Sequence, residues 1–215
     1  MKNVVAINAG PRKNWNTDKL IKAACEGASL DGAYVEYIDL YQLDKYMGCR
    51  SCFACKLPDN YGRCVFRDGL YDVLEKIRTA DALIIGTPNY LGDLTAGFRA
   101  LYERLIFQAL TYNLEEYVYN KHFIPTLLIT TSNCPEDYYE EIGYTKILDN
   151  YVANFNKFVG PTSLLICGDT VQVSDYSRYN WTMFNPEEKI RHHEETFNDY
   201  LNKAKQLGKN LINGN

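Results

Sequence analysis

The sequence predicts an α/β protein in which a five-stranded parallel sheet is covered by helices on both faces. First, five short apolar stretches show little polar alternation, which is typical of strands buried on both faces of a parallel sheet. Second, a segment with helical spacing follows each stretch, so strands and helices alternate along the chain. The predicted strands are residues 3–8, 33–38, 82–87, 123–131 and 163–167.

The helical segments complete a repeating strand–helix pattern. Leu70, Val73, Leu74 and Ile77 recur at three- and four-residue spacing, which indicates an amphipathic helix. Pro186 suits the first turn of the last helix, where its missing N–H costs nothing. This pattern predicts a flavodoxin-like, doubly wound sheet with strand order 2-1-3-4-5 in three α/β/α layers. The predicted helices are residues 17–29, 69–79, 94–110, 136–158 and 186–211.

Length, charge and composition narrow the class of protein. The chain has 215 residues and a net charge of −4, which argues against a broad nucleic-acid-binding face. It has no apolar run near the ~20 residues that cross a bilayer, and its start lacks a signal-peptide core. We expect one cytoplasmic domain over residues 1–215 that binds neither nucleic acid nor membrane. It carries a cysteine-rich insertion at about 48–67, after the second strand, and a Tyr-rich extension at about 171–215.

The loop after the first strand is a candidate phosphate site. In doubly wound sheets ligands bind at the carboxyl ends of the strands. This loop leads into a helix N-terminus, whose free N–H groups suit an anion, and Arg12 can pair with a phosphate through two N–H groups. The dinucleotide and P-loop glycine motifs are both absent. A surface turn in which Asn16 or Thr17 caps the helix is the alternative interpretation.

The loops after the third and fourth strands carry further ligand-binding features. Pro88 stiffens the first of them, Tyr90 offers a flat ring for stacking, and Gly92 permits close approach of the backbone. The second loop, residues 130–135, is dense in small hydrogen-bonding groups. Each loop alone is also compatible with ordinary turn chemistry. All three lie at one edge of the predicted sheet, which favours a site for a planar, phosphorylated ligand.

Three segments resemble the NADPH-dependent FMN reductase and iron–sulfur flavoprotein family. The segment AGPRKNWNT resembles the family's phosphate loop, written G-S-P-R-x-x-G-N-T. The segment ADALIIGTPNYLGDLTAGFRALYER resembles its third strand, flavin-contacting loop and next helix, and GCRSCFACKLPDNYGRCVFRDGL resembles its cysteine insertion. Two positions depart from the pattern, because Gly10 replaces a hydroxyl residue and Trp15 replaces a glycine. The resemblance covers about the first half of the chain.

The resemblance implies an FMN-binding oxidoreductase that passes electrons from NAD(P)H to a quinone, a flavin or another small acceptor. It places the FMN phosphate on the loop after the first strand and the ring between the other two loops. It assigns no catalytic side chain. The implied FMN contacts are Gly10, Pro11, Arg12, Asn14, Asn16, Thr17, Pro88, Asn89, Tyr90, Leu91, Gly92, Thr131, Ser132 and Asn133.

Four cysteines form a compact motif. Cys49, Cys52, Cys55 and Cys64 give the spacing C-x₂-C-x₂-C-x₈-C, whose first three positions match those of bacterial ferredoxins. Three interpretations stay open. The cysteines hold a [4Fe–4S] cluster that exchanges electrons with the flavin; they hold zinc, whose ligands usually come in two separated pairs; or they are thiols or labile disulfides near the flavin.

Two other functions stay open beside the NAD(P)H oxidoreductase. One is an iron–sulfur electron carrier that takes electrons from ferredoxin and has no NAD(P)H activity. The other is a cysteine-based sensor of metal or oxidant. The aromatic residues of 138–151 and 176–181 either form a dimer interface, roof the ligand site or pack within the fold. We expect a homodimer or homotetramer.

The remaining cysteines and two neighbouring histidines are predicted to be structural. Cys25 lies in the first predicted helix and Cys167 in a predicted strand, so both are expected to be core thiols. Cys134 is in a ligand-side loop but has no evident base partner in the sequence. His192 and His193 are expected on a solvated helix face, because successive helical residues diverge.

Overall fold

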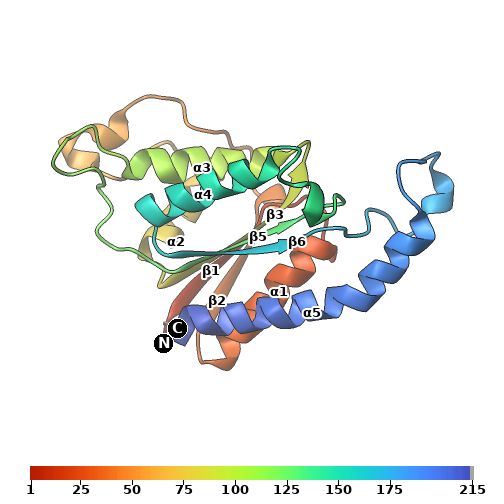
Figure 1. Cartoon of the computed structure of the whole chain (residues 1–215). Coiled ribbons are helices and arrows are strands. Elements are labelled where there is room, and N and C mark those ends of the chain that lie inside the picture. The colour runs from red at the N-terminus through yellow and green to blue at the C-terminus, as the bar shows by residue number, and fades with distance from the viewer. Residues whose placement is uncertain (214–215) are drawn as a thin grey trace.

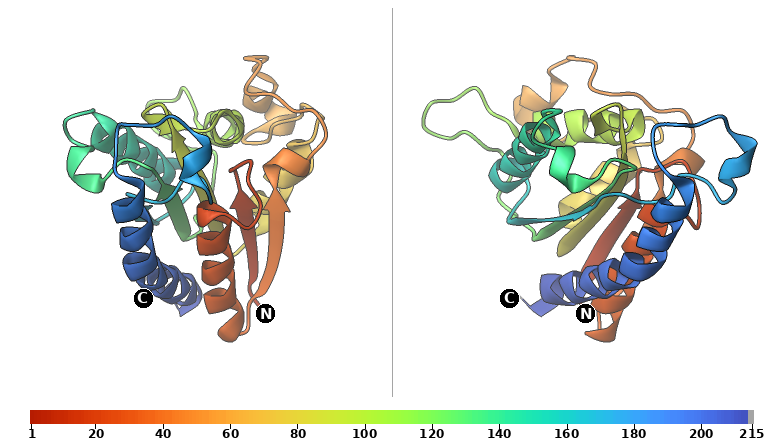
Figure 2. Two further views of the ribbon diagram at one scale, coloured as in Figure 1. Left: turned by 90° about the vertical axis from the view of Figure 1, so that its right-hand side faces the viewer. Right: turned by 45° about the vertical axis from the view of Figure 1, so that its right-hand side comes forward.

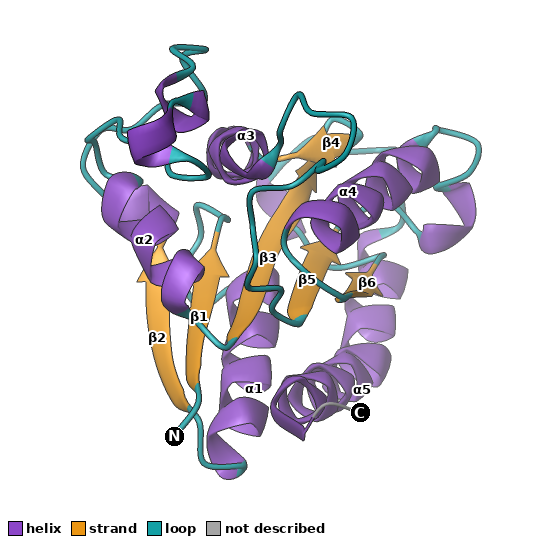
Figure 3. Cartoon of the chain, turned by 90° about the vertical axis from the view of Figure 1, so that its left-hand side faces the viewer, coloured by secondary structure: helices purple, strands orange, loops and turns teal. Residues whose placement is uncertain are grey.

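A parallel sheet forms the middle layer of the molecule. The computed structural model describes residues 1–213 of the chain. Its parallel strands follow the order β2-β1-β3-β5-β6 (Figure 3), which is the predicted order 2-1-3-4-5 when these five are numbered alone. The strands are β1 (Asn3–Asn8), β2 (Tyr34–Asp39), β3 (Ala82–Tyr90), β5 (Thr126–Thr131) and β6 (Thr162–Cys167).

A sixth, short strand was not predicted. β4 (Asp93–Leu94) pairs antiparallel with the end of β3, which continues beyond the predicted end at residue 87. The two strands are joined by Leu91 and Gly92, both of which have positive φ. A two-residue loop with two positive φ angles is the usual geometry of a tight β-hairpin. Sequence periodicity cannot reveal a strand of two residues.

Helices cover both faces of the sheet (Figure 1). α1 (Asn16–Leu30) and α5 (Pro186–Asn213) lie on one face, while α2 (Tyr71–Thr79), α3 (Ala96–Ala109) and α4 (Tyr144–Phe158) lie on the other. The helix predicted over 136–158 begins only at Tyr144. Residues Glu136–Tyr138 form a separate 3-10 turn, and Gly143 has a φ of +73° that interrupts the helix. This part of the prediction was therefore wrong.

Each face of the sheet has its own apolar core. One core joins the sheet to α2, α3 and α4, and the other joins it to α1 and α5. Tyr144 and Tyr151 of α4 are fully buried in the first core, where Tyr151 packs edge-on against Phe98 of α3. Most of the aromatic character of residues 138–151 therefore serves packing within the fold.

α1 and α5 approach each other closely through two glycines. A Cβ atom at Gly27 would lie 1.9 Å from the carbonyl oxygen of Lys205, and one at Gly208 would lie 1.9 Å from that of Ala24. Only glycine fits at such distances. The close contact fixes α5 along α1, and α1 begins at the loop that follows β1.

The loops at the carboxyl ends of the strands include one long segment. Residues 168–185, here called the strap, connect β6 to α5 and project beyond the sheet (Figure 2, right). The cysteine-rich insertion lies near α3, on the face of the sheet that α2, α3 and α4 cover (Figure 2). Among residues 1–213, no helix combines the length and apolar character needed to cross a membrane.

Candidate functional site

A wide cleft of about 750 Å³ opens at the carboxyl ends of β1, β3, β5 and β6. Such a volume is in the range of cofactor and small-molecule sites. The three loops singled out from the sequence meet here, and thirteen of the fourteen proposed FMN contacts line the cleft. Asn14 is the exception. The topology therefore brings together residues that are more than 100 positions apart in the sequence.

The N-terminus of α1 points its free N–H groups at this cleft. Trp15 occupies the N-cap position, and within residues 1–213 no side chain supplies a capping hydrogen bond. The alternative in which Asn16 or Thr17 caps the helix is therefore wrong. Asn16 instead donates to the carbonyl oxygen of Val171 at 2.8 Å, and the Thr17 hydroxyl lies 2.7 Å from that of Thr131. The first-turn N–H groups are left for an anion.

Asn14 shapes the loop from outside the cleft. Its backbone has a φ of 55°, its N–H donates to Asp18, and its side-chain oxygen accepts from Lys22 at 2.8 Å. Burial alone would raise the pKa of Asp18, but hydrogen bonds from Lys22, Tyr37 and the Asn14 N–H outweigh it and lower that pKa. In this structure Asn14 supports the conformation of the loop and does not line the cleft.

Gly10 has a steric reason to lack a side chain. A Cβ atom there would lie 3.1 Å from Cδ of Pro88 and 3.2 Å from the side-chain oxygen of Asn8, which accepts from the Gly10 N–H. The loops after β1 and β3 therefore pack directly against each other. Thr95 reinforces this contact, because its hydroxyl donates to the carbonyl oxygen of Ala9 at 2.6 Å.

The β3–β4 hairpin forms one wall of the cleft. Asn89 accepts a hydrogen bond from the Gly92 N–H at 3.1 Å, which closes the turn. Leu91, at the tip, is fully exposed and has a φ of 57°, an unusual combination for a branched apolar residue. Tyr90 is half exposed beside it. The wall therefore offers a rigid turn with apolar and aromatic groups at its rim.

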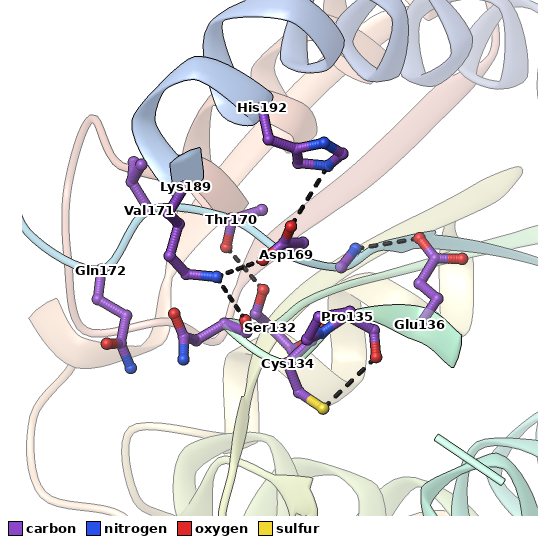
Figure 4. A network of polar contacts seen from close by, with 12 residues as sticks. Ser132, Cys134, Pro135, Glu136, Asp169, Thr170, Val171, Gln172, Lys189 and His192 are labelled. Atoms are coloured by element: carbon purple, nitrogen blue, oxygen red, sulfur yellow. Dashed lines mark hydrogen bonds and ion pairs between the residues drawn. The ribbon is translucent and has the colours of Figure 1, made fainter. Parts of the chain in front are cut away.

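The loop after β5 forms the opposite wall and is held by the strap and α5 (Figure 4). Thr170 donates from both its N–H and its hydroxyl to the carbonyl oxygen of Ser132, at 2.9 Å each. Lys189 of α5 is almost completely buried. Its Nζ donates to the carbonyl oxygen of Asn133 at 2.8 Å and pairs with the carboxylate of Asp169. The Asn133 backbone is therefore fixed from behind the cleft.

Two polar atoms of the cleft residues have no partner. Oδ1 of Asn133 and the indole Nε1 of Trp15 are buried, and within the described residues neither makes a hydrogen bond. Buried polar groups nearly always have partners in proteins, so these two atoms are exceptions among the residues that line the cleft. The fit to a phosphorylated flavin rests instead on the N-terminus of α1, which has no side-chain cap within the described residues, and on Arg12, both of which lie at the cleft.

The strap supplies cleft residues that sequence motifs did not reveal. The aromatic density of residues 176–181 was the only signal in the sequence, and a roof over the ligand was one of three interpretations of it. Tyr179 and Trp181 do line the cleft, whereas Tyr176 is buried beneath them. The lining residues absent from the proposed set are Trp15, Cys134, Ile142, Thr170, Val171, Gln172, Val173, Tyr179, Trp181 and Met183.

The two histidines of α5 are not simply solvated. Nε2 of His192 lies 3.7 Å from the carboxylate of Asp169 (Figure 4), and the ring of His193 stacks on Phe197 at 4.4 Å. Burial lowers the pKa of His193, with a smaller contribution from Lys19. The expectation of a wholly exposed helix face was therefore too simple, although the two rings do diverge.

The four clustered cysteines line a separate cavity beside the C-terminal half of α3. This cavity and the cleft share no lining residue, so the structure does not place these thiols at the flavin site. Residues 1–213 hold no group of three or more Cys, His, Asp or Glu side chains arranged for a metal ion. Four thiols are suitable donors for an iron–sulfur cluster, but this structure does not gather them into a ligand set. The residues are Cys49, Cys52, Cys55 and Cys64.

α3 anchors the cysteine-rich insertion at several points. Glu103 accepts from the Cys49 N–H at 3.1 Å, and Gln108 accepts from the Cys64 N–H at 2.9 Å. The Lys56 ammonium donates to carbonyl groups at the C-terminus of α3. Arg104 is buried beneath the cavity, and its guanidinium pairs with Asp68 at 2.5 Å. The insertion is therefore attached to the helix that follows the β3–β4 hairpin.

All seven cysteines, which lie within the described residues, are free thiols. Burial raises the pKa values of Cys25 and Cys167 to about 12, as expected for thiols packed in a core. Cys134 lines the cleft, but partial burial raises its pKa as well, despite the nearby charge of Lys189. None of the three is an activated nucleophile.

The fold and cleft define a flavodoxin-like protein with a site for a phosphorylated, planar cofactor at the carboxyl edge of its sheet. The model of the NADPH-dependent FMN reductase family matches residues 2–127, which is more than half of the chain. The chain belongs to this family. The match includes the phosphate loop, the cysteine-rich insertion and the β3–β4 hairpin, but it ends before the strap and α5.

Similar curated proteins are iron–sulfur flavoproteins. The chain is 32% identical over 103 residues to one from Methanosarcina thermophila, with 48% of this chain and 52% of that protein covered. It is 36% identical over 103 residues to one from Archaeoglobus fulgidus, with 47% of each covered. The chain therefore spans about half the length of the curated relatives it matches.

Solved structures share the fold across nearly the whole chain. The NAD(P)H:quinone oxidoreductase from Methanothermobacter marburgensis has a TM-score of 0.69 at 18% identity and covers 98% of this chain and 96% of its own. An FMN-dependent NADH-azoreductase from Bacillus anthracis in complex with FMN has a TM-score of 0.61 at 16% identity. The match covers 97% of this chain and 100% of the azoreductase chain. At these identities the likeness shows the fold alone.

Proposed function

We propose that the protein is an FMN-dependent oxidoreductase that passes electrons from NAD(P)H to a small acceptor such as a quinone. The observation that carries this proposal is the cleft at the carboxyl edge of the sheet. There the N-terminus of α1, which has no side-chain cap among residues 1–213, lies with Arg12 beside the loops that follow β3 and β5. Family membership supports FMN as the occupant.

In this proposal the phosphate lies at the N-terminus of α1. The free N–H groups of the first turn bind it, and Arg12 and Thr17 contribute side-chain donors. The ring lies between the β3–β4 hairpin and the loop of residues 131–133, which both line the cleft. These residues bind and orient the cofactor and exclude water from the inner face of its ring.

The net reaction balances without a catalytic side chain. FMN, when bound, would supply the two-electron chemistry that links hydride donation by NAD(P)H to reduction of the acceptor. Overall, NAD(P)H, one proton and a quinone give NAD(P)⁺ and a hydroquinone. The described residues that line the cleft include no His, Asp, Glu or Lys, and in this proposal the one proton comes from solvent.

A reduction experiment tests the proposal. Protein reconstituted with FMN should show the absorption of a bound flavin, bleach when NADH or NADPH is added anaerobically, and recover its colour on addition of menadione. Bleaching by dithionite but by neither nicotinamide would contradict NAD(P)H activity. Failure to retain FMN at all would contradict the assignment of the cleft.

A second candidate function is an iron–sulfur electron carrier. The four cysteines that line one cavity, and the similarity to iron–sulfur flavoproteins over half of the chain, favour it. Anaerobic reconstitution followed by iron and acid-labile sulfide assays tests it, with Cys55→Ser as the paired variant. Iron and sulfide that are retained by the native chain and lost in the variant would support a cluster. Their absence from both would overturn it.

A further inference from the structure

The strap carries a cluster of aromatic side chains that pack around the buried ring of Tyr176. Tyr176 is buried at its centre and packs edge-on against Trp181 and Phe184, with ring centroids 6.0 and 5.7 Å away. The Tyr176 hydroxyl also accepts a hydrogen bond from the Gln172 N–H at 2.9 Å. The strap is therefore a packed structure with its own small core.

The strap is also tied to the phosphate loop. The Arg12 guanidinium donates to the carbonyl oxygen of Gln172 at 2.6 Å, and the Asn16 amide donates to that of Val171 at 2.8 Å. Both contacts join side chains of the phosphate loop to the backbone of the strap. The outer wall of the cleft is thus held in place by the loop proposed to bind the FMN phosphate.

The surface that the strap turns toward the cleft is aromatic and partly open. Tyr179 and Trp181 are stacked, with centroids 4.4 Å apart and planes 20° apart, yet both are about two-fifths exposed. Met183 beside them is 91% exposed. All three line the cleft, and so do the exposed apolar side chains of Leu91 and Ile142. Large apolar groups left open around one cleft indicate a binding surface.

The cleft has very few charged side chains, which bears on the ligands that it can accept. Among the described residues that line it, Arg12 alone is charged, and its guanidinium lies 3.9 Å over the ring of Trp15 while it donates to the strap. Arg12 belongs to the proposed phosphate end of the cleft. An anionic acceptor at Tyr179 and Trp181 would lose hydration without gaining a counter-charge, which is costly.

We propose that Tyr179, Trp181 and Met183 form the acceptor subsite, and that this subsite selects uncharged planar aromatic acceptors over anionic ones, flavin phosphates included. The proposal rests on the proposed function and deepens it. Flat rings gain dispersion and quadrupole attraction on an aromatic pair, and a thioether adds a favourable sulfur–ring contact. All three residues lie beyond the segment that matches the family model, so the selectivity belongs to the strap of this chain.

Substitution of Trp181 tests the aromatic contact. Trp181→Ala should raise the KM for naphthoquinone about tenfold relative to the KM for ferricyanide, an acceptor that cannot stack. Trp181→Phe should recover most of the loss because it keeps a flat ring. Tyr117→Ala, at a half-exposed tyrosine outside the cleft, is the control and should change neither value. Equal KM changes for both acceptors in Trp181→Ala would overturn the proposal.

A charge substitution tests selectivity without disturbing the core. Met183→Lys places a cation at a side chain that is already 91% exposed, so the fold should tolerate it. The variant should raise kcat/KM for naphthoquinone sulfonate relative to uncharged naphthoquinone about fivefold, and Met183→Gln should leave the ratio near that of the native chain. A native chain that already prefers the sulfonate would overturn the proposed selectivity.

A binding measurement separates the subsite from the electron-transfer chemistry. Naphthoquinone binding is measured by equilibrium dialysis against the FMN-loaded protein without any electron donor. The affinity should fall in Trp181→Ala and be retained in Trp181→Phe. If NAD(P)H fails to reduce the protein but this pattern holds, the proposed function fails and the subsite stands. If reduction succeeds and the affinities are equal, the subsite fails and the proposed function stands.

Discussion

At the scale of single residues, Asp18 organises the candidate site without facing it. Its carboxylate accepts from the Asn14 N–H at 2.5 Å and from Lys22 at 2.8 Å, and it also receives the Tyr37 hydroxyl. These contacts join the phosphate loop to α1 and to β2. A charged acceptor with three donors is more stable ionised than protonated, which is why the pKa of Asp18 lies below its ordinary value despite burial.

We expect Asp18→Asn to lower the free energy of unfolding by about 1–2 kcal/mol at neutral pH, because hydrogen bonds to a charged acceptor are replaced by weaker ones. The lowered pKa means that this contribution is present above the ordinary pKa of 3.8 and is lost as the pH falls through the folded value. Urea denaturation at several pH values should therefore show a gap between native and variant that closes only in acid. Asp149→Asn, at an exposed aspartate of α4, is the control, and a gap that stays constant down to acid pH would contradict this account.

Arg12→Ala should weaken FMN binding by about 1.5–3 kcal/mol, the value of a charge-assisted hydrogen bond. The structure adds that Arg12 also donates to the strap, so the variant should loosen Trp181 as well. Flavin fluorescence titration measures the affinity. The FMN affinity of Arg12→Lys should lie between those of the native chain and Arg12→Ala, because an ammonium keeps the charge but not the forked geometry. Unchanged affinity in Arg12→Ala would show that the phosphate lies elsewhere.

At the scale of elements, the packing of α5 on α1 depends on two missing side chains. Gly208→Ala would place a methyl group against the Ala24 carbonyl oxygen and force the helices apart. We expect a loss of about 2 kcal/mol in unfolding free energy, although alanine favours a helix over glycine by about 1 kcal/mol. Asn202→Ala, at an exposed position of the same helix, should be neutral or stabilising. Thermal and urea denaturation distinguish the two outcomes, and a stabilised Gly208→Ala variant would contradict the close contact.

The contact between α5 and the loops of the cleft depends on Lys189. Lys189→Met removes the donor to Asn133 and leaves the carboxylate of Asp169 without its cation, which should cost about 1–3 kcal/mol of stability. FMN binding should weaken too, because the Asn133 wall is no longer held. Adding Asp169→Asn to the variant should recover part of the stability, and His192→Gln alone, at a half-exposed ring, should have little effect. If the double variant recovers no stability, Lys189 and Asp169 are not energetically coupled.

At the scale of the whole molecule, the sequence predicted the layers better than it predicted the connections. The strands were predictable because their apolar residues face two helical layers, as Ile84 and Ile85 do on opposite faces of β3. The loops after the first and third predicted strands could be singled out because local chemistry limits them: Arg12 stands beside a helix start, and Gly92 stands in a turn. The pairing of β3 with β4 was not predicted. Hydrophobic periodicity predicts the strands, whereas the chemistry of turns and helix starts singles out the two loops.

The parts that could not be predicted depend on long-range packing. Nothing in the order of residues shows that Asn14 turns away to Asp18, that Leu91 adopts a positive φ, or that the strap folds back onto residues 10–17. The helix predicted from residue 136 fails for a local reason, because Gly143 interrupts it, and the position of that break depends on Tyr144 entering the core. Tertiary contacts decided each of these points.

The attachment of the strap to the phosphate loop has a consequence for the order in which the molecule is made. The Arg12–Gln172 hydrogen bond joins positions 160 residues apart, and the Asn16–Val171 bond joins positions 155 apart. Because the strap follows β6, a ribosome must release the whole sheet before the cleft can acquire its outer wall. A nascent chain that ends at β6 would have a phosphate loop but no strap. The cleft therefore gains its outer wall only at a late stage of biogenesis, after translation has passed the strap.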